Sequence, residues 1–258
     1  MRPLHRPSRG HEDRDPVPST FPDFQELEPR LVFSSVMAAA PIRPPAVLRA
    51  TDGTDVPMPA RRRDLVPTGR NRFWILEPGF VTAFAGNEDG AHKRLTVTVT
   101  PKTRVIDGIR TRVVIERQTS NSHIEEISQN YFAIDRKTRN VYYFGEDVNI
   151  YNHGVVVSHE SAWRSGVNGA KFGLVMPGEV TLGSQMQQER APGVAEDHAE
   201  VVRTGVRAHV FAGVFRGSIQ TGETSVLEPG VEEFKLYAPG VGLVLDDTLL
   251  LVSYTQLD

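Results

Sequence analysis

Acidic side chains follow an aromatic run near the middle of the sequence, where they could take part in proton transfer. Glu146 and Asp147 come directly after Tyr142-Tyr143-Phe144. A carboxyl group that aromatic side chains shield from water holds its proton more tightly and can act near neutral pH. We therefore predict Glu146 and Tyr142 as catalytic residues. The alternative is that Glu146 is a turn residue that follows an aromatic strand.

A second polar cluster lies further along the chain and places a histidine among carboxylates. Its members are Glu189, Glu196, Asp197, His198 and Glu200. Carboxylates beside a histidine can raise its pKa and orient its ring for acid–base catalysis. On a strand, however, His198 and Glu200 share one face while Asp197 points to the other, so only part of the cluster can converge. We predict His198 as a third catalytic residue, with a surface or capping role as the alternative.

Large apolar side chains are spread along the same part of the chain. Ligand pockets are lined mainly by such side chains. The predicted substrate-binding residues are Trp74, Tyr131, Phe144, Trp163, Phe172 and Met176. The alternative is that they fill an ordinary core.

Several kinds of chemistry lack their sequence signatures. The chain has no cysteine and eight histidines without HExxH spacing, and His153 and His159, on two facing strands, have no evident third ligand. There is no GxSxG nucleophile elbow and no glycine-rich phosphate loop between a strand and a helix. We therefore expect neither a metal nor a cofactor.

The elements that must position these side chains are β-strands. From Asn71 onward the sequence alternates in polarity and is punctuated by turn residues, such as Asp107-Gly108 and Asn152-His153-Gly154, which predict hairpins. About ten closely spaced strands predict an antiparallel meander that closes into a barrel or folds into a sandwich. We favour a single all-β barrel over residues 71–258, lipocalin-like in general shape, because closure removes exposed edges.

Two segments depart from this alternation. Residues 1–70 hold most of the 18 prolines and are predicted to be a disordered leader, because proline removes amide donors and restricts its predecessor. The glycine- and proline-rich stretch from Trp163 to Gly193 is predicted to be a long ordered excursion that covers one barrel mouth as a lid.

Composition limits the partners. The 29 basic and 32 acidic residues give a net charge of −3, so nucleic acid is not an expected partner. No apolar run approaches the roughly 20 residues that span a bilayer. Residues 31–40 resemble the apolar part of a signal peptide but lack the short basic segment that should precede it. We expect a cytoplasmic protein, with export or the cell envelope as the alternative, and the sequence indicates no oligomeric state.

Several co-linear motifs over roughly residues 71–246 resemble a family of uncharacterised, mostly exported or lipid-anchored bacterial β-rich proteins. The motifs are Asn71-Arg72-Phe73-Trp74, Tyr142-Tyr143-Phe144-Gly145-Glu146-Asp147, Pro192-Gly193-Val194-Ala195-Glu196-Asp197, Leu227-Glu228-Pro229-Gly230-Val231 and Tyr237-Ala238-Pro239-Gly240-Val241-Gly242-Leu243. The resemblance implies an envelope location but no established activity, and this chain lacks the cysteine on which a lipid anchor is built.

These observations lead to one hypothesis and one rival. The first is a cofactor-independent cyclase or isomerase that acts on a largely apolar, polyketide-like molecule inside the barrel. Such an enzyme would belong to bacterial secondary-metabolite or antibiotic biosynthesis. Such chemistry needs only shape, exclusion of water and a few proton-transfer groups. The rival is a non-catalytic protein that binds a small hydrophobic ligand or belongs to the envelope.

Overall fold

The computed structural model describes residues 61–256, and this part of the chain is almost entirely β-structure. The predicted all-β fold is confirmed. Residues 1–60 of the predicted leader, with the signal-like stretch 31–40, lie outside the described residues. The rest of that leader forms the 3-10 turn η1 (Arg62–Asp64), the strand β1 (Leu65–Val66) and the start of β2 (Gly69–Asn71), so regular structure begins before residue 71.

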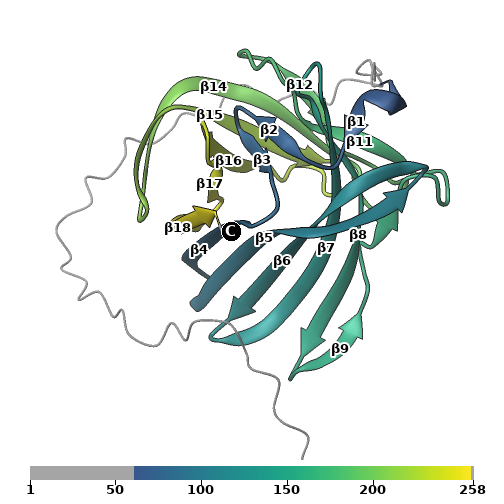
Figure 1. Ribbon diagram of the computed structural model, residues 1–258. Coiled ribbons are helices and arrows are strands. Elements are labelled where there is room, and N and C mark those ends of the chain that lie inside the picture. The colour runs from purple at the N-terminus through teal and green to yellow at the C-terminus, as the bar shows by residue number, and fades with distance from the viewer. Residues whose placement is uncertain (1–60, 257–258) are drawn as a thin grey trace, which may run out of the picture. The chain divides into compact units, whose positions relative to one another are not determined.

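One antiparallel sheet forms the wall of a nearly closed barrel (Figure 1). Its strands follow the order β12 (Gln185–Gln187), β14 (Asp197–Val210), β15 (Gly213–Ser225), β16 (Glu233–Ala238), β17 (Gly242–Asp246), β18 (Leu249–Gln256), β4 (Phe80–Glu88), β5 (Ala91–Ile106), β6 (Ile109–Ser120), β7 (His123–Asp135), β8 (Val141–Asn152), β11 (Lys171–Met176) and β13 (Glu189–Arg190). Beside this path, β1 pairs with β7, and β9 (Val155–Ser158) and β10 (Trp163–Arg164) pair with β8.

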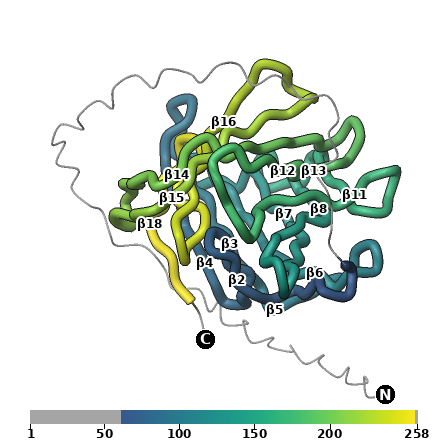
Figure 2. Tube along the Cα trace, turned by 90° about the horizontal axis from the view of Figure 1, so that it is seen from above, coloured from purple at the N-terminus to yellow at the C-terminus, as the bar shows by residue number. Residues whose placement is uncertain are grey.

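A single short segment brings the two ends of this order together. β12 pairs with β14, while β13, two residues further along the chain, pairs with β11. Between them the Gln188 amide donates a hydrogen bond to the Asp197 carbonyl oxygen at 2.8 Å. In the view from above, β14, β15 and β18 lie on one side and β7, β8 and β11 on the other (Figure 2).

The hairpins predicted from turn residues are present. Asp107 and Gly108 have φ angles of 47° and 73° and join β5 to β6. His153 and Gly154, with φ angles of 49° and 78°, join β8 to β9. Residue pairs of this kind suit two-residue turns because both central positions need positive φ.

The stretch from Trp163 to Gly193 is not the separate lid that its composition predicted. It contains β10, β11, β12 and β13, and it completes the barrel wall. Two of its glycines, Gly173 and Gly178, allow backbone segments to approach closely. A Cβ atom on Gly173 would lie 2.1 Å from the Gln188 carbonyl oxygen, so only glycine lets the two segments pass at this point.

A hairpin of β2 and β3 (Trp74–Leu76) lies inside the barrel and shows which face of the sheet is the interior one. The Trp74 ring lies 5.1 Å from Phe132 on β7 and 6.3 Å from Tyr237 on β16, between ring centroids. β7 and β16 are far apart in the sheet order, so a ring that touches both lies between opposite walls. The Asn71 side chain holds the hairpin by donating hydrogen bonds to the carbonyl oxygens of Arg139 and Pro177.

The outer face of β7 and β8 carries a second packed layer. Beyond an irregularity between Val99 and Thr103, the end of the β5–β6 hairpin bends over this face. There the Arg104 guanidinium lies 5.3 Å from the centre of the Tyr131 ring. Tyr131 is completely buried as a result. The wall therefore carries packed side chains on both of its faces, one packed region inside and one outside, and the two are joined in one hydrophobic cluster.

Candidate functional site

Carboxyl groups from many strands converge inside the barrel. Glu116 lies on β6, Glu126 on β7 and Glu146 on β8. Their cross-strand partners are Ser128, Gln118 and Asn130, and this register puts the three glutamates on the same face of the sheet. Burial, and then repulsion from Glu116, Glu126 and Asp197, raises the pKa of Glu146. The interior carboxyl groups belong to Glu116, Glu126, Glu146, Glu189, Asp197, Glu223 and Asp246.

A lysine neutralises one side of this interior. Lys235 Nζ lies 3.0 Å from Glu223 Oε2 and 3.5 Å from Asp246 Oδ1. Glu223 Oε1 also accepts hydrogen bonds from the side-chain nitrogen Nε2 of Gln188 at 3.3 Å and from the Thr221 hydroxyl at 3.2 Å. These two carboxylates are therefore held by partners.

Three other interior carboxyl groups have no such partner. Glu116, Glu146 and Glu189 have no ion pair among residues 61–256, and all three are half-buried. Burial and neighbouring carboxylates raise the pKa of Glu146 to about 8, although the Tyr143 hydroxyl opposes the rise. The same two causes raise the pKa of Glu189 to about 8 and that of Glu116 to about 7. Carboxyl groups of this kind hold a proton at neutral pH and can donate it.

Aromatic rings stand beside Glu146. Trp163 is its direct partner across the β8–β10 pair, and the Trp163 ring meets the Tyr143 ring edge-on at 5.4 Å. Tyr143 stacks on Phe132 at 4.7 Å, and its hydroxyl donates to Asn130 Oδ1 at 2.5 Å. A cavity of about 300 Å³ opens next to this group. Its lining includes Glu146 and Trp163, the ion-paired Asp147 and Arg164, and the small or apolar residues Ala162, Ala191, Pro192 and Val194.

The three predicted catalytic residues do not meet. Glu146 faces the interior, but Tyr142 neighbours the inward-facing Tyr143 on β8 and so points outward, where its hydroxyl accepts a hydrogen bond from the Asn140 amide at 3.1 Å. Asp197 faces the interior carboxyl groups, so His198, the next residue on β14, points the other way. Alternation along a strand separates neighbours in sequence.

The predicted substrate-binding residues divide between the two packed regions. Trp74 and Trp163 face the interior. Phe144 and Phe172 stack at 4.6 Å between ring centroids in the outer region, beside Tyr142. Tyr131 belongs to the outer region as well, and Met176 is fully buried in the larger core cluster. All six belong to or pack against one core cluster, but only Trp163 lines the cavity beside Glu146.

The structure adds Glu116, Tyr143, Lys235 and Tyr237 to the site. Each is a polar residue at an inward-facing position of a strand, and that pattern was present in the sequence. The sequence alone did not say which face of each strand was the interior, because several strands carry polar residues on both faces.

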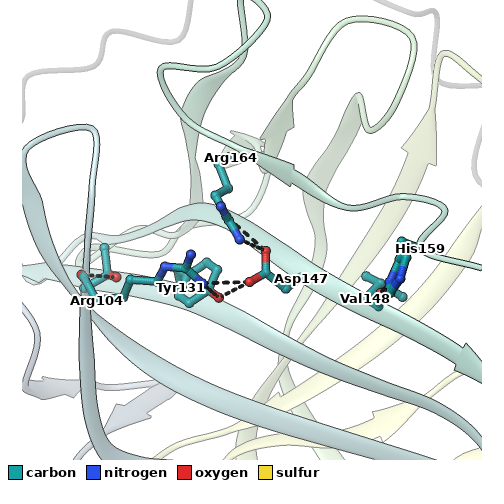
Figure 3. Close-up of polar contacts among 7 residues, drawn as sticks. Arg104, Tyr131, Asp147, Val148, His159 and Arg164 are labelled. Atoms are coloured by element: carbon teal, nitrogen blue, oxygen red, sulfur yellow. Dashed lines mark hydrogen bonds and ion pairs between the residues drawn. The ribbon is translucent and has the colours of Figure 1, made fainter. Parts of the chain in front are cut away.

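Asp147, next to Glu146, serves the outer region (Figure 3). Its Oδ2 accepts hydrogen bonds from the Tyr131 hydroxyl and from Arg104 Nη1, both at 2.7 Å. Its Oδ1 accepts from Arg164 Nε at 3.0 Å and is also bonded by Arg164 Nη2. Burial favours the neutral acid, but the bonds from Tyr131 and Arg164 outweigh it and lower the pKa of Asp147. Asp147 thus fastens the β5–β6 hairpin and β10 to β8.

No protein-family model, curated protein or solved structure matches the chain. In residues 61–256 no helix is long and apolar enough to cross a membrane. Over the same residues, no three His, Asp or Glu side chains are grouped so that they could hold a metal ion.

Proposed function

We propose that the protein is a cofactor-independent cyclase or isomerase for a small, largely apolar molecule, with Glu146 as its general acid. The observation that carries this proposal is the position of Glu146. Its carboxyl group lacks an ion pair among the described residues, lies against Trp163 and Tyr143, and borders a cavity of about 300 Å³. That volume is at the lower end of the range for ligand pockets.

The chemistry follows from the protonation state of Glu146. A carboxyl group with a pKa of about 8 is mostly protonated at pH 7 and can give its proton to a carbonyl oxygen or an alkene carbon of the substrate. The positive charge that develops is stabilised by the faces of nearby aromatic rings. Ring closure or migration of a double bond then releases a proton, which the Glu146 carboxylate takes back. The substrate and the product have the same composition, so no co-reactant is needed.

For the substrate class and the location we keep the hypotheses drawn from the sequence. We propose a polyketide-like secondary metabolite as the substrate and the cytoplasm as the location. The aromatic wall of Trp163, Tyr143 and Phe132 would hold the apolar part of such a molecule against the carboxyl group.

A second candidate function is non-catalytic binding of a small ligand. The observation that favours it is the excess of interior carboxyl groups over the one interior lysine described above, which suits a ligand that carries a positive charge. The resemblance to exported bacterial proteins is consistent with a carrier in the envelope. Binding without turnover would distinguish this candidate from the first.

An isotope experiment tests the proposed activity. The purified chain is incubated in D₂O with a panel of linear polyketide-like enones and epoxides, and products are separated by liquid chromatography and mass spectrometry. The proposal predicts an isomer of at least one class of compound. The isomer carries one deuterium on carbon where an alkene carbon is protonated, and only exchangeable deuterium where an oxygen is protonated. Ligand-dependent stabilisation without any isomer would favour the carrier, and neither result would reject both.

A further inference from the structure

The end of the β14–β15 hairpin reaches β18 and is fastened there (Figure 1). The Ala212 amide, at the turn of the hairpin, donates a hydrogen bond to the Leu251 carbonyl oxygen on β18 at 2.9 Å. The side chains of Ala208 and Phe215 pack in or against the smaller core cluster of the barrel. We call residues 207–216 the hairpin tip. One face of this tip is therefore part of the core, and the other is the outer face.

Apolar side chains are exposed on the outer face of the hairpin tip. Phe211, at the turn between the two strands, is 64% exposed, and Val214 is 49% exposed. Val214 is the direct partner of the exposed His209 across the β14–β15 pair. Both therefore point away from the core that holds their sequence neighbours.

β18 extends this exposed apolar surface. Val252 follows Leu251, to which the tip is bonded, and is 43% exposed. Tyr254 is 46% exposed, and its ring lies 6.1 Å from the Phe215 ring between centroids. Single exposed apolar residues are normal on a protein surface, but several that lie together mark an interaction site. The apolar surface comprises Phe211, Val214, Val252 and Tyr254.

The charged side chains of the same hairpin are positive. The sequence from Val201 to Gly222 carries Arg203, Arg207 and Arg216 and contains no acidic residue. All three arginines are exposed and have no ion pair among residues 61–256. β18, from Leu249 to Gln256, contributes no charge that could neutralise them. The hairpin is thus cationic behind an apolar turn.

Two of these arginines share the outer face with the apolar residues. Ala208 and Phe215 are direct partners across the strand pair, and both face the core. Arg207 and Arg216 adjoin these two residues on the side away from the turn, so alternation places both arginines on the outer face. An anionic surface that covered this face would meet both guanidinium groups and the apolar turn at once.

We propose that the hairpin tip docks on the surface of an anionic lipid bilayer. Guanidinium groups bind the phosphates of lipid headgroups through charge-assisted hydrogen bonds, and each basic residue near the surface adds to the attraction. Exposed apolar side chains can enter the boundary between headgroups and acyl chains, and tyrosine suits that boundary because its ring is apolar and its hydroxyl is polar. A nucleic acid or a soluble anion would use the arginines but leave the apolar turn in water. The proposal does not depend on the proposed activity, because it uses no residue of the site around Glu146.

Cosedimentation of the full chain with lipid vesicles tests the proposal. One set of vesicles contains phosphatidylcholine alone, and the other contains phosphatidylcholine mixed with phosphatidylserine. We expect the chain to bind the anionic vesicles, and we expect this binding to weaken as sodium chloride is added, because salt screens the attraction. Absence of binding to both sets, or equal binding to both, would overturn the proposal.

Two substitutions test whether the hairpin tip makes the contact. Phe211→Ser should weaken binding to the anionic vesicles about tenfold or more, because a phenylalanine ring no longer leaves water on docking. Arg207→Gln should weaken it about fivefold, the effect of one basic residue near a charged membrane.

Each of these variants has a matched control outside the hairpin. Val155→Ser on β9 removes an apolar side chain that is 65% exposed, and Arg117→Gln on β6 removes an exposed positive charge. Both controls should bind the anionic vesicles nearly as the native chain does, and circular dichroism verifies that every variant is folded. Equal weakening by a tip variant and its control would show that the tip is not the docking surface.

A second copy of the chain is the alternative occupant of the same surface. Sedimentation velocity without lipid, over a range of protein concentrations, detects such self-association. The proposal predicts that Phe211→Ser changes vesicle binding and leaves the sedimentation of the chain as it was. Self-association that Phe211→Ser abolishes would assign the apolar surface to a second copy and overturn the proposal.

Discussion

Glu146 and Asp147 are consecutive acids on β8, yet the two regions that they face treat a carboxyl group in opposite ways. Inside the barrel, Glu146 has carboxylates and aromatic rings as neighbours, and its pKa rises to about 8. Outside the barrel, Asp147 accepts bonds from Arg104, Tyr131 and Arg164, and its pKa falls. The interior arrangement lowers stability at neutral pH and makes Glu146 a proton donor. The second fastens the β5–β6 hairpin and β10 to β8.

The largest expected effect is on turnover. Glu146→Gln keeps the shape of the side chain but removes the transferable proton, so isomer formation should fall by about 10²-fold or more, as for loss of a general acid. Asp147→Asn should retain most of the turnover of the folded fraction. The rates of product formation by the two variants are measured under identical conditions and compared. Equal losses would show that the two acids do not have the separate roles assigned here.

The next effect is on stability, where the order of the two variants reverses. Asp147→Asn weakens three contacts at a partly exposed carboxylate, and we expect it to lower the free energy of unfolding by about 1–2 kcal/mol. Glu146→Gln should cause no loss at pH 8, because it removes a carboxylate that its neighbours repel. Urea denaturation measures both. Asp89→Asn is the control, since Asp89 is an exposed turn residue with a φ angle of 50°, which asparagine tolerates.

Stability should also depend on pH with opposite signs for the two regions. Glu146 and Glu189 bind protons more tightly in the folded chain, since their pKa rises from 4.5 to about 8. Their stabilising contribution is complete below pH 4.5 and is lost as the pH rises through about 8. Asp147 has a lowered pKa, so its contribution is present above its ordinary value of 3.8 and is lost as the pH falls.

Thermal unfolding across the pH range can separate these two contributions. Between pH 5.5 and 8.5 the melting temperature of the native chain should fall, and the double variant Glu146→Gln/Glu189→Gln should show a flatter curve. The Asp147→Asn variant should keep the native slope in this range. An identical slope for the double variant would mean that the interior carboxyl groups are not the cause.

The smallest expected effect is an indirect one. After burial, repulsion from Glu116 is the largest cause of the raised pKa of Glu146. Glu116→Gln should therefore move the pH dependence of turnover to lower pH, by less than about one pH unit for a single neighbour at effective protein dielectric. The pH profile of kcat, compared with that of Glu126→Gln, measures the shift. A fall in kcat without any movement of the profile would indicate a structural role for Glu116.

The sequence predicted the strands, the turns and Glu146 because each depends on local pattern. Alternating polarity marked the strands, and Asp107-Gly108 marked a hairpin. The sequence could not predict that β11, β12 and β13 close the barrel wall. The glycines of residues 163–193 are typical of a loop, and only the structure shows Gly173 against the Gln188 carbonyl oxygen. Nor could it bring Glu116 and Glu189 to Glu146, since that depends on which face each strand turns inward. His198 and Tyr142 were chosen for chemical type, and alternation placed them on the outside.

The most direct test of this account is the titration of Glu146 itself. The carboxyl carbons of glutamate are labelled with ¹³C, and the Glu146 resonance is assigned by its disappearance in Glu146→Gln. The account predicts that this resonance titrates near pH 8, well above the ordinary value of 4.5. Titration near pH 4.5 would contradict it, because Glu146 would then be an ordinary ionised carboxylate at neutral pH.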